Sequence, residues 1–205
     1  MGFGKSEVKI IIGSIVFLIL AAVSYKLYFA GQTSTSQNQI LRPYPTSNKT
    51  QELSVHSGDG TAQLIMRKAS QKDNSILYSF FAANASGKIE RTLFTKNIPT
   101  SDTMIIPANT WSPDNKYVFL RENNSNSFSV FVFKASGEAF ADQEQYLDLT
   151  ALFAKRNLPY TVADVTGWDS ETLLHMHTTA KEKNSRGPSY WFDVTDRAFL
   201  QLATL

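Results

Sequence analysis

Two histidines and three aspartates are the side chains whose types and spacing could do chemistry in this sequence. His175 and His177 flank one methionine on a predicted strand, where side chains two apart share a face and could reach one metal ion. Asp59, Asp114 and Asp169 recur every 55 residues, and carboxylates are common acid and base catalysts. These five residues are the first candidates for a metal site or a catalytic site.

A structural role nevertheless fits these residues better. Each aspartate lies in a predicted turn, where its carboxylate can accept hydrogen bonds from nearby backbone amides, and paired catalytic carboxylates do not normally recur at the same turn of every repeat. The histidine pair has no identifiable third ligand, because His56 is the only other histidine. Trp111 and Trp168 could serve as ligand platforms, but their matching positions favour packing in the core or between repeats.

The sequence contains none of the local motifs that are typical of common enzyme classes. It has no cysteine, which excludes disulfide scaffolds, thiol catalysis, iron–sulfur clusters and cysteine-ligated zinc. It has no nucleophile elbow, no phosphate-binding P-loop and no glycine-rich dinucleotide fingerprint. We therefore expect a protein that is not an enzyme and has no cofactor. The alternative is an envelope hydrolase or a metal-dependent enzyme that uses the carboxylates or the histidine pair.

The positive charge of the chain is confined to its N-terminus. Residues 1–30 hold three lysines and one glutamate, whereas the remainder holds 17 basic and 17 acidic residues and is neutral overall. The sequence pI of 8.7 is thus a property of the first residues. Without a basic stripe in the rest of the chain, nucleic-acid binding has no electrostatic support.

The elements that must position the candidate residues begin after an apolar N-terminal segment. Residues 10–30 are uncharged apart from Lys26, which can extend its ammonium group to the interface, and about 20 helical residues span a bilayer. They predict one transmembrane helix that anchors the chain in the cell membrane. Lys5 and Lys9 precede it, which favours a cytoplasmic tail of residues 1–9 and an extracytoplasmic location for the rest.

Three other interpretations of this segment stay open. It could be a cleaved signal peptide, with Ala22-Val23-Ser24 as the best small-residue site, or a buried helix of a soluble protein. Gly2, Phe3 and Glu7 also match the spacing of a type IV prepilin processing site, which suggests a pilin-like subunit. However, Gly4-Lys5-Ser6 lies where that family is mostly apolar.

A polar linker and a set of repeats follow. Residues 31–51 lack an apolar pattern and predict a flexible spacer. From residue 52 onward, short β-rich runs alternate with turns in three units, about 52–95, 103–149 and 160–203. Each unit reads as four strands, with Leu93, Leu147 and Leu200 marking the fourth at spacings of 54 and 53 residues. A short helical turn up to Asn157, capped by Asp148 or Thr150, is expected between the second and third units.

Four antiparallel strands in a unit of this length are typical of a β-propeller blade. The segment Trp111-Ser112-Pro113-Asp114-Asn115-Lys116 resembles the first turn of the blades in TolB-like (WD-repeat-like) β-propellers. The resemblance covers roughly residues 52–205 and is best in the middle unit. It implies an all-β fold of blade-like repeats, not an activity, because propellers serve many roles.

Three units are fewer than the four to eight blades of a closed propeller. We therefore expect a partial or open propeller that stays an open arc, closes by association with itself or a protein partner, or collapses into a sandwich. The exposed blade faces of an arc would favour such association. Taken together, these patterns predict a single-pass, membrane-anchored, extracytoplasmic protein with a binding or scaffolding role in the cell envelope.

Overall fold

A computed structural model describes residues 50–183 and 185–203. These described residues belong to one compact unit, and the transmembrane helix expected at residues 10–30 lies outside them. In the part of the chain that the structure describes, no helix is long and apolar enough to cross a membrane.

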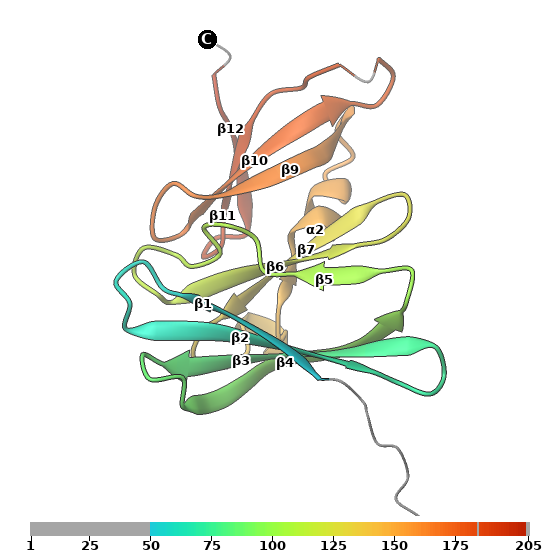
Figure 1. The fold of residues 1–205 in the computed structure, drawn as a ribbon. Helices are drawn as coiled ribbons and strands as arrows, with labels where there is room; N and C mark the ends of the chain where they lie inside the picture. The colour runs from blue at the N-terminus through green and yellow to red at the C-terminus, as the bar shows by residue number, and fades with distance from the viewer. Residues whose placement is uncertain (1–49, 184, 204–205) are drawn as a thin grey trace, which may run out of the picture. The chain divides into compact units, whose positions relative to one another are not determined.

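The described chain is built from three antiparallel sheets of four strands each, which follow one another along the sequence (Figure 1). Every sheet is a meander, in which consecutive strands pair. The first sheet contains β1 (Gln51–His56), β2 (Ala62–Ser70), β3 (Ser75–Asn84) and β4 (Ile89–Pro99). The second contains β5 (Thr103–Ile105), β6 (Tyr117–Asn123), β7 (Phe128–Lys134) and β8 (Leu147–Asp148). The third contains β9 (Tyr160–Trp168), β10 (Leu173–Ala180), β11 (Tyr190–Asp193) and β12 (Ala198–Gln201).

Alternating burial explains why these segments form strands that pack on one another. In β3 the side chains of Tyr78 and Phe80 are buried while their neighbours are less so, and in β10 Leu174 and Met176 behave in the same way. The three predicted units of four strands are therefore confirmed as three four-stranded antiparallel sheets. The all-β fold class is also confirmed for the described residues.

The second sheet lies between the other two and is buried on both faces. Its strand β6 places Val118 and Leu120 in an apolar core shared with the first sheet, and Phe119 in a second core shared with the third sheet. Two ion pairs also connect the sheets: Lys96 contacts Glu122, and Arg121 Nη1 lies 3.0 Å from Asp164 Oδ1. The middle sheet thus joins both cores.

Several strands of the second sheet end where local features of the chain stop them. Strand β5 ends at Ile105 and does not reach Pro107, whose nitrogen has no hydrogen to donate. Strand β8 is only two residues long because α2 (Leu149–Ala154) begins at Leu149. Asp148 caps this helix by accepting a hydrogen bond from Ala151 N, which is one of the two expected caps. A short 3₁₀ turn, η1 (Ala141–Gln143), precedes β8.

The leucine that marks the fourth strand is not equivalent in all three sheets. Leu93 and Leu147 are buried, but Leu200 is 47% exposed. Leu200 pairs with Trp191 on the face of the third sheet that points away from the second sheet. All three leucines lie in the fourth strand of their sheet, as expected, but Leu200 does not belong to a core.

Candidate functional site

The first two sheets use the same serine–aspartate turn between their first and second strands. Ser57 Oγ donates to Asp59 Oδ1 over 2.7 Å and accepts a hydrogen bond from Ala62 N over 3.0 Å. The backbone N–H of Thr61 and the hydroxyl of Ser57 hold the pKa of Asp59 far below its usual range. A carboxylate that stays ionised in this way fixes the turn and is a poor proton donor near neutral pH.

The second turn repeats this geometry. Ser112 Oγ donates to Asp114 Oδ1 over 2.8 Å and accepts from Tyr117 N over 2.9 Å. Burial alone would raise the pKa of Asp114, but hydrogen bonds from Lys116 and Ser112 outweigh it, and the pKa is lowered. Asp114 therefore also remains ionised and holds its own turn.

Asp169 occupies a different position in the third turn. Its backbone N–H donates to Leu173 O, as Ser57 N does to Ala62 O and Ser112 N to Tyr117 O. Asp169 thus corresponds to the two serines and not to Asp59 and Asp114, because the third turn closes one residue earlier and β9 continues to Trp168. The even spacing of 55 residues does not mark equivalent carboxylates.

The two tryptophans link neighbouring sheets through their indole nitrogens. Trp111 Nε1 donates to Val55 O over 3.3 Å, and Trp168 Nε1 donates to Thr110 O over 3.0 Å. Both acceptor residues, Val55 and Thr110, belong to the repeat before that of the donating tryptophan. Each lies directly before the residue that holds the tryptophan's position in that earlier repeat. Trp111 is 8% exposed, and Trp168 stacks on Tyr117 at 6.0 Å between ring centroids.

His175 and His177 lie side by side on the outer face of the third sheet, with ring centroids 4.8 Å apart. Their Nδ1 atoms are occupied by hydroxyl groups, at 3.2 Å from Thr166 Oγ1 and 2.9 Å from Ser189 Oγ respectively. Burial, together with the nearby His175, lowers the pKa of His177. Within residues 50–183 and 185–203, no group of three histidine, aspartate or glutamate side chains is placed to hold a metal ion.

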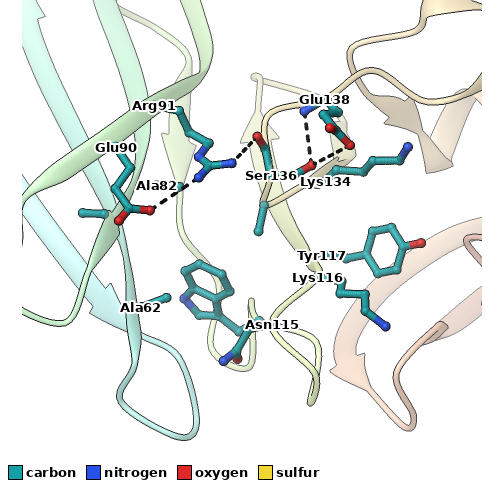
Figure 2. Close-up of a pocket in the computed structure, with 13 residues that line it drawn as sticks. Ala62, Ala82, Glu90, Arg91, Asn115, Lys116, Tyr117, Lys134, Ser136 and Glu138 are labelled. Atoms are coloured by element: carbon teal, nitrogen blue, oxygen red, sulfur yellow. Dashed lines mark hydrogen bonds and ion pairs between the residues drawn. The ribbon is translucent and has the colours of Figure 1, made fainter.

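A groove lies between the first and second sheets and has a volume of about 500 Å³ (Figure 2). Small or aromatic side chains form its apolar part: Ala62, Ala82, Ala83, Trp111 and Ala135. Charged side chains of both signs surround them: Glu90, Arg91, Lys116, Lys134 and Glu138. Large side chains fill most of the interface between the first and second sheets. At one end of it the small alanine side chains leave this space open.

The charged groups of the groove are paired, but loosely. Arg91 Nη1 donates to Ser136 O, and its Nη2 lies 3.4 Å from Glu90 Oε2. Lys116 Nζ lies 2.9 Å from Asp114 Oδ2 and remains 70% exposed, so water screens this ion pair strongly. Such exposed contacts cost little to exchange for contacts with a ligand.

The groove offers charged and polar side chains that a ligand could contact. Its described lining residues include no histidine, and their two side-chain hydroxyls belong to Tyr117 and to Ser136, whose Oγ lies 3.5 Å from Glu138 Oε2. This arrangement is suited to binding. Sequence reasoning did not find the groove, because its signal is a set of alanines whose proximity only the packing of two sheets reveals.

Neither family models, nor curated proteins, nor solved structures give a match to this chain. The resemblance to TolB-like propellers therefore depends on the turn at residues 111–116 and on the repeat pattern alone.

Proposed function

We propose that this protein is a single-pass, membrane-anchored binding module of the cell envelope, whose extracytoplasmic domain is a partial TolB-like propeller. The groove between the first two sheets carries this proposal. It combines an apolar floor of alanines and Trp111 with charges of both signs at its rim. Ligand sites typically combine apolar walls with a few oriented polar groups in this manner.

A segment of a partner protein is the ligand class that suits the groove best. An apolar side chain of the segment would lie on the alanines, while its backbone and flanking charges would meet both the cationic and the anionic groups of the rim. The mixed signs of Arg91, Lys134, Glu90 and Glu138 disfavour a polyanion such as nucleic acid. The same contacts could be made by a second copy of the chain, which is the self-association alternative.

The membrane anchor makes a prediction of its own. We expect the full chain to stay in the membrane pellet through alkaline carbonate extraction, because residues 10–30 can span a bilayer. Deletion of residues 10–30 should release the protein, whereas deletion of the polar residues 31–39 should not. Release of the full chain, or a mature N-terminus near residue 25, would contradict the anchor and favour a cleaved signal peptide.

The groove is tested by photo-crosslinking in intact membranes. A photoreactive amino acid at Ser136 should give a discrete protein adduct, whereas the same substitution at Thr179, on the outer face of the third sheet, should not. The double variant Lys116→Glu and Glu138→Lys should lower the adduct yield about tenfold, since rim charges that each contribute up to ~1 kcal/mol become repulsive.

Charge reversals outside the groove serve as controls, because they distinguish a specific effect of the groove charges from a general effect of charge on the adduct yield. Lys72→Glu and Glu182→Lys change exposed residues outside the groove and should leave the adduct yield unchanged. Absence of an adduct at Ser136, or equal losses in the two double variants, would refute binding in the groove. An adduct with twice the mass of the chain would identify a second copy as the occupant.

A further inference from the structure

A second cavity, here called the indole pocket, lies where the turns of the repeats meet and has a volume of about 310 Å³. His56, Trp111 and Trp168 line it together. These three residues hold corresponding positions, because each directly precedes the residue whose backbone N–H closes the turn: Ser57, Ser112 and Asp169. The repeat therefore brings one aromatic ring from each of the three sheets to the same pocket.

Both indoles are fixed in orientation and offer carbon surface to the indole pocket. Their N–H groups are used by Val55 O and Thr110 O, and Tyr117 stacks on Trp168. An incoming ligand would thus meet preoriented rings and lose little entropy in ordering them.

Two polar side chains of the indole pocket have no hydrogen-bond partner within the described part of the chain. Among the described residues, neither the amide of Asn109 nor the imidazole of His56 makes a hydrogen bond, whereas the hydroxyls of Thr110 and Ser112 are bonded within the protein. Asn109 is held in a left-handed backbone conformation, with φ of 54°, and lies tightly against Gly167. Its amide is therefore a preoriented donor and acceptor at the edge of the indole surface.

The charges around the indole pocket narrow the class of ligand. Its described lining residues include no aspartate, glutamate, lysine or arginine. An anion would find no lysine or arginine there, and a cation would lack a carboxylate to complement its contact with the rings. A neutral molecule with an apolar face and several hydroxyl groups matches both the ring surface and the free amide.

We propose that the indole pocket binds a neutral saccharide. The C–H face of a sugar ring would pack on the indoles, and its hydroxyls would bond to Asn109 and His56. The cavity volume is at the lower end of the ~300–1,000 Å³ range of small-molecule sites, which fits a short saccharide end. Among the described lining residues, Trp111 alone also lines the groove, so the two sites can be tested separately.

The experiment titrates the full chain, in micelles of a polyoxyethylene detergent that carries no sugar, with maltotriose, cellotriose and chitotriose. The intrinsic fluorescence of its three tryptophans reports binding. At least one trisaccharide should change the fluorescence saturably, and tetramethylammonium chloride should not. If none of the three sugars gives a saturable change, or if tetramethylammonium binds instead, the proposal fails.

Variants locate the binding within the molecule. Asn109→Gly removes the amide and keeps the left-handed backbone accessible, so it should weaken sugar binding about tenfold. Trp168→Phe should weaken it at least as much. Asn157→Gly, at an asparagine with φ of 51° outside the pocket, and Trp191→Phe are the matched controls and should bind normally. Unchanged binding in Asn109→Gly, with the variant folded by circular dichroism, would overturn the assignment.

Discussion

Replacing Gly167 by alanine should lower the free energy of unfolding by about 2–4 kcal/mol, which urea denaturation followed by circular dichroism would measure. Gly167 has φ of 136°, a conformation that residues with a Cβ rarely adopt. An added Cβ would also lie 2.7 Å from Asn109 Cβ, far closer than two carbons pack. Both strain and collision therefore oppose this small substitution.

Gly58 provides the matched control, because a Cβ there would meet nothing within 4 Å and its φ is not positive. We expect Gly58→Ala to change stability by at most ~1 kcal/mol, in either direction. Equal effects of the two substitutions would show that the contact between Gly167 and Asn109 is looser than described. A folded Gly167→Ala protein should also bind saccharide more weakly, since Asn109 must move.

The sheets were predictable because their signals are local. Alternating apolar residues in β3 and β10, and turns rich in Gly, Asn and Asp, indicate strands without any knowledge of distant contacts. The N-cap of α2 could also be predicted from the sequence, since Asp148, one of the two candidate caps, directly precedes the helix. Strand ends were less so, because the helix at Leu149 competes with β8 for the same residues.

Counting a period along the sequence was reliable for the units and unreliable for single side chains. Asp169 is 55 residues after Asp114, yet its backbone hydrogen bond places it with Ser112. The third turn is one residue shorter than the second, so equal spacing does not give equivalent positions there. Alignment of Trp168 with Trp111 instead places Asp169 opposite Ser112, in agreement with the structure. Leu200 lies in the fourth strand as its spacing predicted, but its register against Trp191 places it on the face away from the core.

The groove and the indole pocket were not predictable, because both form between repeats. Ala82 and Ala135 lie on different sheets, and only the packing of those sheets brings them to one cavity. The two tryptophans were noticed for their matching positions, which favoured packing. The structure adds that each indole N–H donates to the preceding repeat and that both rings line one pocket, which His56 also lines.

The largest losses of stability are expected from truncating the two cores, with Phe80→Ala and Phe192→Ala each costing about 3–5 kcal/mol. Both rings are fully buried, Phe80 in the core between the first and second sheets and Phe192 in the core between the second and third. Phe81→Ala is the matched control, because this neighbouring ring lies on the outer face under Arg67, with the guanidinium 5.1 Å from its centroid. It should cost roughly 1–2 kcal/mol, since the ring is only partly buried.

These variants also distinguish a cooperative domain from a row of independent repeats. The middle sheet contributes Leu120 to one core and Phe119 to the other, so loss of either core should remove support from the other. Hydrogen exchange followed by mass spectrometry should then show β2 and β11 losing protection together in both Phe→Ala variants. If Phe80→Ala exposes β2 while β11 keeps its wild-type protection, the three sheets unfold as separate units and binding at the groove cannot be coupled to the third sheet.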